Sequence, residues 1–182
     1  KTALWVGALN NDAMLEETQL EDGGTDYHMV GDPTEGSILV AAYKAGAGSA
    51  DLGKAYPRKN EIPFDSERKR MVTIHAINDP RLEDLSPFVD ESQKNWHAVA
   101  VKGAPDVVLK LCTRIQSMDD RSARPLDDET RNQILSANDV MTEKALRVLG
   151  VAFRIVENAP DNIEDKGKIE EDLIFVGLIG MI

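Results

Sequence analysis

The sequence predicts an α+β domain in which helices pack on an antiparallel sheet of about six strands. Three observations support this class. The expected elements follow in the order helix, helix, hairpin, strand, helix, helix, strand, strand. The long alternation of strands and helices that marks a doubly wound nucleotide fold is missing. The hydrophobic content of 42% and the charged content of 29% over 182 residues are globular values, and this length can bury a core.

The first helix and three of the loops are assigned from the composition of their residues. Residues 2–9, TALWVGAL, are expected to form a short buried helix. Residues 16–30 are acidic and contain glycines, so we expect a loop there, and a second loop over 46–57, which contains Gly48, Gly53 and Pro57. Residues 78–95 are polar and contain two prolines, which indicates a surface excursion.

The stretch GDPTEG at 31–36 predicts the start of a helix. Asp32 suits the N-cap, and Pro33 suits the first helical position because its missing N–H is not needed there. Glu35, three residues after the cap, would complete a capping box. Gly46 is expected to end this helix.

Alternating apolar residues and proline or aspartate caps mark the other elements. Residues 58–64 and 70–77 are expected to form an antiparallel hairpin around the connection DSER. Further strands are expected at 96–104, 147–156 and 172–181, and further helices at 105–112, from Pro105, and at 127–145, from an Asp127–Asp128 cap.

The formal net charge of −11 restricts the classes of partner. An acidic surface repels nucleic-acid phosphates and anionic lipids, so we expect neither nucleic-acid binding nor membrane contact by this segment. The longest apolar run, residues 173–182, is too short to span a bilayer. The single cysteine, Cys112, can make no internal disulfide, which fits a reducing compartment. We also expect the isolated chain to be a monomer.

Most motifs of self-sufficient enzymes are absent from the sequence. It contains no GxxxxGK[ST], no GxGxxG after a strand, no HExxH and no GxSxG. The three histidines, His28, His75 and His97, are scattered, and the last two fall in expected strands, where a structural role is more common than a metal-binding one. We therefore expect no complete active site in this chain.

Several residues that could bind a ligand also have ordinary structural explanations. Glu35 fits a helix cap, Phe64 at a strand end fits the core, and Lys69 in an ERKR run fits a solvated surface. Gly103 before Pro105 is first of all a turn residue. Lys102, at the end of an apolar strand, is harder to explain this way because lysine is seldom buried without a partner.

Four stretches in register carry a family resemblance. They are GDPTEG (31–36), PFDSERKRM (63–71), VKGAPD (101–106) and ALRVLGVAFR (145–154). Together they resemble the nucleotide-binding domain of P-type cation-transporting ATPases of type II, the branch of the calcium and sodium/potassium pumps. The stretches GDPTEG and PFDSERKRM are more similar to the sequences of prokaryotic calcium pumps than to those of animal sodium/potassium pumps. The resemblance covers essentially the whole chain.

The resemblance implies an adenine site. Glu35 corresponds to the acid that reaches the adenine amino group, and Phe64 to the aromatic residue that stacks on the ring. Lys102 is expected deep in the adenine pocket, with Gly103 beside it so that the backbone can approach the base. A carboxylate accepts from an exocyclic amine, which would favour adenine over guanine.

The resemblance also implies contacts with the phosphates. Lys69 corresponds to a lysine near the nucleotide, and Arg147 to an arginine that contacts the phosphates. An arginine can make forked contacts with phosphate oxygens. ATP is thus the expected ligand, with ADP as its product.

The family's function is divided between domains. The phosphorylated aspartate of this family lies in a DKTGT sequence, which this chain does not contain. Mg²⁺ is expected mainly in the separate phosphorylation domain. Residues 1–182 are expected to be a single nucleotide-binding domain excised from a larger membrane pump, with the phosphorylation and actuator domains as partners and a cytoplasmic location. The alternative is a non-catalytic interaction or regulatory module that keeps this fold, and a self-contained hydrolase is poorly supported.

Overall fold

The structure is a computed structural model that describes residues 1–20, 23–46, 49–82, 85–159 and 166–182. The helices in these ranges are α1 (Thr2–Leu9), α2 (Pro33–Lys44), α3 (Ser49–Ala55), α4 (Pro105–Lys110), α5 (Asp128–Glu143) and α6 (Lys166–Ile169). The strands are β1 (Met14–Gln19), β2 (Thr25–Val30), β3 (Arg58–Asp65), β4 (Arg70–Ala76), β5 (His97–Gly103), β6 (Cys112–Gln116), β7 (Ala123–Pro125), β8 (Arg147–Val156) and β9 (Leu173–Met181).

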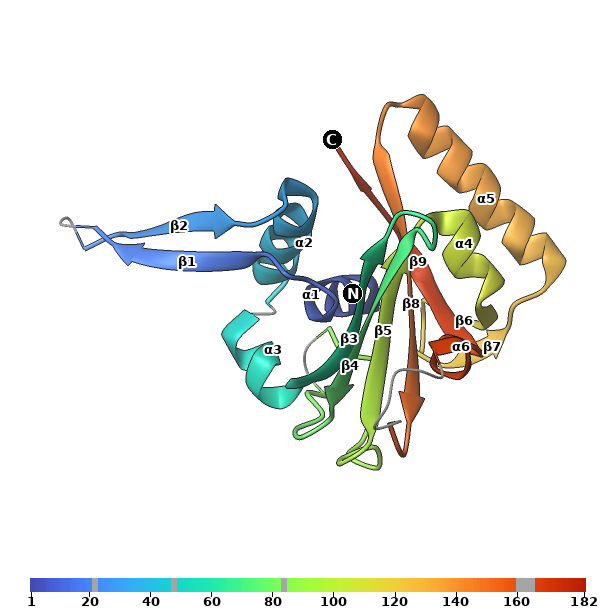
Figure 1. Ribbon diagram of the computed structural model, residues 1–182, viewed down its shortest axis with the longest axis horizontal. Helices are drawn as coiled ribbons and strands as arrows, with labels where there is room; N and C mark the ends of the chain where they lie inside the picture. Colours follow the sequence, from blue (N-terminus) through green and yellow to red (C-terminus); the bar gives the residue numbers. More distant parts are fainter. Residues whose placement is uncertain (21–22, 47–48, 83–84, 160–165) are drawn as a thin grey trace.

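The main sheet has seven strands in the order β3-β4-β5-β8-β9-β6-β7, and β1 and β2 form a separate hairpin (Figure 1). Neighbouring strands run antiparallel except β6 and β9, which run parallel. The predicted α+β class is confirmed. About six strands were expected and five were placed on the sequence; the seven-stranded sheet adds the unpredicted strands at 112–116 and 123–125, and the first of these makes it not purely antiparallel.

Helices cover both faces of this sheet, with α1, α2 and α3 on one side and α4 and α5 on the other (Figure 1). Strand β5 contributes side chains to the hydrophobic cores on both faces of the sheet. Ala98 and Ala100 belong to the core that contains α1, whereas Val99 and Val101 belong to the core that contains α4. A strand buried on both faces has a continuous apolar sequence, which is why HAVAVKG is recognisable as a strand.

Trp5 of α1 is the centre of the first core. Its side chain is fully buried, and its ring meets Tyr56, Phe88 and Phe153 edge-on at centroid distances of 5.3, 5.8 and 5.9 Å. Such edge-to-face pairs add to the stabilisation from burial. Phe88 comes from the predicted surface excursion at 78–95, whose described residues form no helix or strand. The irregular path expected for this segment is confirmed for its described residues, but the segment is not all at the surface, because Leu85 and Phe88 anchor it in the core.

The predicted loop over residues 16–30 is wrong, since β1 and β2 form a hairpin there. The strands pair from Met14 opposite Val30 to Gln19 opposite Thr25. Nearly all of their side chains are exposed, and so the sequence shows no apolar alternation. Residues 21–22, within the same predicted loop, lie outside the described residues.

The predicted loop over residues 46–57 is also partly wrong, because α3 spans Ser49–Ala55. Gly53 lowers the helix propensity of this short segment. Leu52 and Ala55 are nevertheless buried in the core beside Trp5, and this tertiary contact stabilises the helix. Gly48 lies outside the described residues.

The other predicted elements are confirmed, with small shifts of their ends. The Asp127 side chain caps α5 by accepting from the Thr130 N–H at 2.8 Å, and Gly46, with φ of +95°, follows the last turn of α2. Among the described residues no helix is both long enough and apolar enough to cross a bilayer.

The expectation of a structural role for His75 fits its environment. This residue of β4 is buried, and its Nδ1 lies 2.9 Å from the Tyr56 carbonyl. Burial lowers the pKa of His75 from 6.5 to about 4. The folded protein thus holds the imidazole neutral in a pH range where the unfolded chain binds a proton.

We therefore expect the stability to fall as the pH decreases from about 6.5 to about 4, by about 3 kcal/mol from this residue alone. The measurement is urea unfolding across this range, compared with His75→Gln, which keeps an N–H donor for the Tyr56 carbonyl but does not titrate. An identical pH dependence in both proteins would contradict the assignment.

Candidate functional site

Several strand ends meet at one edge of the seven-stranded sheet. Asp65, the last residue of β3, lies opposite Arg70, the first residue of β4. Arg70 lies opposite Gly103, the last residue of β5, and Gly103 lies opposite Gly150 of β8. Strand β8 begins three residues earlier, at Arg147, and extends past this edge. Three of the four stretches identified in the sequence thus meet here.

The fourth stretch reaches this edge through an ion pair. Lys102 of β5 is 7% exposed, and its ammonium donates to the Glu35 carboxylate of α2 and to the Asn10 carbonyl at the end of α1. Burial lowers the pKa of Lys102, while the hydrogen bond and charge of Glu35 act in the opposite direction. The buried lysine thus has the partner that its position requires.

The N-terminus of α2 is capped as predicted, but the capping box is wrong. The Asp32 carboxylate accepts from the N–H groups of Thr34 and Glu35 at 2.8 and 3.3 Å. Glu35 does not complete the box with the Asp32 N–H. One of its carboxylate oxygens binds Lys102, and the other accepts from the Asp12 N–H at 2.9 Å. A charged ammonium is a stronger partner for a carboxylate than a neutral amide is.

The segment after α1 was predicted only as a helix end, yet it connects the site. The Asn10 side chain is fully buried and donates to the carbonyls of Met71 and Ala100 at 3.0 and 2.7 Å. The Asn11 side chain donates to the Glu35 carbonyl at 2.9 Å. Two asparagines directly after an apolar helix were the available signal, because a buried amide requires hydrogen-bond partners.

Phe64 is an exposed aromatic residue at the end of β3. Its exposed fraction is 64%, so the core position that a strand end suggests is wrong. The irregularity between Ile62 and Asp65 places Pro63 and Phe64 opposite Met71. Met71 is in turn paired with Lys102, so the backbone at Phe64 lies two strands away from the lysine of the ion pair.

Lys69 and Gly103 are in contact through their backbones. Lys69 lies in the turn between β3 and β4 with φ of +53°, and its carbonyl accepts from the Ala104 N–H at 3.0 Å. A Cβ added to Gly103 would lie 2.4 Å from the Lys69 carbonyl oxygen. Glycine is therefore needed here for the close approach of the turn, while the Lys69 side chain is exposed.

Glu170 holds the same turn, although it was not among the residues predicted for the site. Its carboxylate is 2% exposed and pairs with the guanidinium groups of Arg68 and Arg70. The ERKR run is thus only partly a solvated surface, since its two arginines are turned inward. Nothing local in IEED distinguishes Glu170 from the exposed Glu171 beside it.

Arg147 lies beside the N-terminus of α2. Its guanidinium donates to the Thr34 hydroxyl at 2.7 Å, and the side chain is exposed. Hydrogen bonds with Thr34 hold the pKa of Asp32 below its usual range, and the charge of Arg147 adds a smaller effect. Arg147 therefore binds Thr34, the residue next to Glu35 in the sequence, and lies close to Asp32.

The structure brings the six predicted site residues to one end of the sheet, although only some of them touch. Glu35 and Lys102 are in direct contact, and Gly103 packs on the backbone of Lys69. An exposed aromatic face, a buried carboxylate–ammonium pair and exposed cations lie together. These groups suit a ligand that has a flat ring with an amine and an anionic tail.

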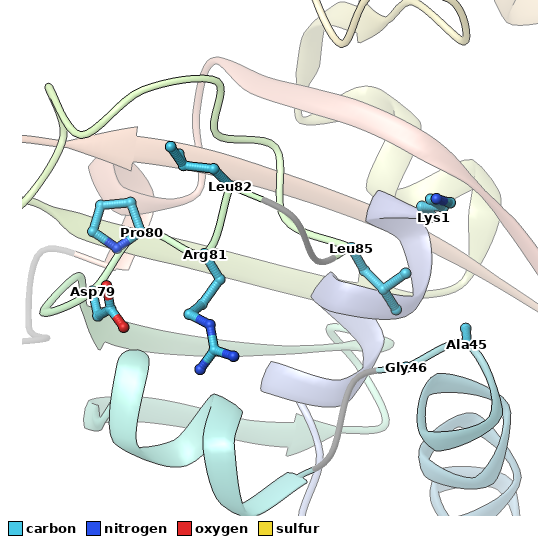
Figure 2. Close-up of a pocket in the computed structure, with 8 residues that line it drawn as sticks. All are labelled: Lys1, Ala45, Gly46, Asp79, Pro80, Arg81, Leu82 and Leu85. Carbon is cyan, nitrogen blue, oxygen red and sulfur yellow. The ribbon is translucent and has the colours of Figure 1, made fainter.

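A separate cavity of about 420 Å³ lies between the start of α1, the end of α2, residues 79–82 and Leu85. Figure 2 shows Arg81, Asp79 and Lys1 among its lining residues. None of the six predicted site residues lines it. This cavity is therefore not the site that the sequence predicts.

The described residues offer little other chemistry. They contain no group of three or more histidine, cysteine or acidic side chains arranged to hold a metal ion. Cys112 is buried, and burial raises the pKa of its thiol to about 12. A thiol with such a pKa is a poor nucleophile near neutral pH.

Comparison with known proteins gives a consistent result. The sequence matches the family described as "P-type ATPase, cytoplasmic domain N" over residues 1–182. Calcium-transporting ATPase 1 of Bacillus cereus is 36% identical over 179 residues, which cover 96% of this chain and 18% of that protein. Cation-transporting ATPase pma1 of Synechocystis is 36% identical (98% of this chain, 17% of that protein), and the calcium-transporting ATPase of Bacillus subtilis is 32% identical (98% and 17%). The chain spans less than a fifth of each of these relatives.

Gly103→Ala tests the close contact at the edge of the sheet. The added methyl group would meet the Lys69 carbonyl and the Arg70 backbone, and overpacking of this kind destabilises by about 1–3 kcal/mol. The control is Gly53→Ala in α3, where nothing lies within 4 Å and a helical alanine stabilises by about 0.5–1 kcal/mol. The free energies of unfolding from urea titrations should change in opposite directions, and a neutral Gly103→Ala would contradict the contact.

Proposed function

Because this chain belongs to the family of the cytoplasmic N domain of P-type ATPases, we propose that it binds ATP or ADP as one domain of a larger cation-transporting pump. The observation that carries the proposal is the position of Phe64. An exposed aromatic ring lies at the same edge of the sheet as the buried pair of Lys102 and Glu35.

The adenine ring would stack on the exposed face of Phe64. Stacking of a base on an aromatic side chain is worth about 1–3 kcal/mol. A ring that is 64% exposed makes this surface available without rearrangement of the core. Gly103 would let the backbone at the end of β5 approach the base, because it carries no Cβ.

The pair of Glu35 and Lys102 would select adenine. Adenine presents an amine donor at N6 beside an acceptor at N7, whereas guanine presents two acceptors, O6 and N7. A carboxylate acceptor beside an ammonium donor complements adenine and leaves guanine with an acceptor facing Glu35. The two side chains already bind each other, so the base would take over part of an existing network.

Lys69 and Arg147 would bind the phosphates. Both side chains are exposed at this edge, and they carry positive charge in a chain whose formal net charge is −11. Among the residues that the structure describes, Arg147 has one side-chain hydrogen bond, to the neutral hydroxyl of Thr34. A phosphate would be a stronger, charge-assisted partner for its guanidinium.

The chain would deliver the nucleotide without completing the reaction. Its 182 residues contain no DKTGT sequence, and so the aspartate that receives the γ-phosphate would belong to a separate phosphorylation domain, together with most of the Mg²⁺ ligands. Phosphoryl transfer depends mainly on positioning and charge stabilisation, which a domain that carries the nucleotide can supply by closing on its partner. Alone, as a monomer, this chain would bind nucleotide and release no phosphate.

Phe64→Ala and Lys102→Met test the proposed adenine site. We expect wild-type protein to bind ATP more tightly than GTP, and each substitution to weaken ATP binding about tenfold or more, since each removes about 1–3 kcal/mol of contact. Calorimetry or an NMR titration gives the dissociation constants. Val89→Ala, which removes an exposed apolar side chain (70% exposed) elsewhere, should bind ATP as the wild type does. Equal binding of ATP and GTP, or none, would reject the proposal.

A further inference from the structure

Arg58 makes an unusual set of contacts for a residue at the start of β3. Its guanidinium donates to the Leu9 carbonyl at 3.3 Å and to the Asn11 carbonyl at 2.6 Å. It also donates to the carboxylates of Asp12 at 2.6 Å and Glu61 at 2.7 Å. Three of these four partners belong to residues 9–12, the segment formed by the last residue of α1 and the three that follow it.

That segment is also what holds the proposed adenine-recognising pair. The Asn10 carbonyl accepts from the Lys102 ammonium, and the Asp12 N–H donates to the Glu35 carboxylate at 2.9 Å. Arg58 and the pair therefore bind alternate groups of one short stretch of backbone. A displacement of this stretch would move Lys102 and Glu35 together.

The contacts with carbonyls matter more here than the ion pairs. The side chains of Asp12 and Glu61 are 56% and 40% exposed, and exposed pairs contribute little to stability. The Leu9 carbonyl at the end of α1 has no partner within the helix, so a guanidinium that binds it together with the Asn11 carbonyl closes the helix end and fixes the path of the chain after it. A lysine at this position could not span the same set because it lacks the planar fork.

We propose that Arg58 is a positioning residue for adenine recognition, which acts by holding residues 9–12 so that their backbone orients Lys102 and Glu35. Arg58 itself contacts no nucleotide in this arrangement. The inference rests on the proposed function for its consequence in binding, whereas the effect on the segment exists without nucleotide.

The test uses two variants of Arg58 and a matched control. Arg58→Gln removes the charge and the fork, and Arg58→Lys keeps the charge but removes the fork. The control is Arg131→Gln, because Arg131 also binds two carbonyls at the end of a short helix, those of Leu109 and Cys112 at 2.6 Å each, next to α4. Thermal unfolding first establishes that each variant folds, and if Arg58→Gln does not fold, Arg58→Lys carries the test.

The first measurement is hydrogen exchange of the Asp12 amide without nucleotide. Loss of charge-assisted hydrogen bonds of this strength corresponds to about a tenfold effect. We expect about that acceleration of Asp12 exchange in both Arg58 variants and none in Arg131→Gln. The second measurement is the dissociation constant for ATP and for GTP. We expect ATP binding to weaken about tenfold in both Arg58 variants, with a smaller preference for ATP over GTP, because the pair loses its orientation.

The outcomes separate the inference from the proposed function. Wild-type protein that binds no ATP overturns the proposed function and, with it, the role in recognition. Normal ATP binding by the Arg58 variants, or unchanged exchange of Asp12, overturns the inference alone. Wild-type behaviour of Arg58→Lys would mean that charge rather than positioning matters, and an equal loss of ATP binding in Arg131→Gln would mean general destabilisation. Either result also overturns it.

Discussion

A buried ammonium, that of Lys102, is the constraint on which this end of the molecule depends. A charge removed from water must be paired and hydrogen-bonded, and here the partners come from the end of α1 and the first turn of α2. The two helices are thereby fixed relative to β5. Removing one partner of such a pair typically costs about 3–5 kcal/mol, because the other charge stays buried. Any ligand that engages Lys102 or Glu35 must exchange with contacts already made, so its affinity reflects only the difference.

The distribution of charge affects how an anion can approach the end of the sheet that carries Lys102. The chain has 32 acidic and 21 basic residues, so most of its surface repels an anion. Arg68 and Arg70 share the Glu170 carboxylate, whereas Lys69 and Arg147 remain exposed. Arg68 and Arg70 thus have a structural role, and Lys69 and Arg147 are left exposed at the end of the sheet that carries Phe64. Long-range attraction of an anion would be weak, and close contacts would have to supply most of the binding energy.

Local signals were sufficient for the elements that position the site, and tertiary contacts decided the rest. The Asp32 cap, the hairpin around DSER and the apolar run of β5 were predicted because each depends on neighbouring residues. Strand β6 and helix α3 were missed because their stability comes from β9 and from the core around Trp5. Within the site, Lys102 was recognisable from its position in the sequence, whereas Glu170 and Arg58 acquire their roles only from partners distant in the chain.

The parallel pairing of β6 with β9 has a consequence for the order in which the sheet can assemble during translation. Strand β3 is made first, and β4, β5 and β8 each neighbour a strand made earlier, so these four strands can pair as they leave the ribosome. Strands β6 and β7 reach the sheet through β9, which is the last strand of this chain. They are synthesised before β8 yet must wait for residues 173–181, and such non-local pairing is slow. The side of the sheet formed by β6 and β7 is therefore completed last, after β5, which carries Lys102, has paired with its neighbours.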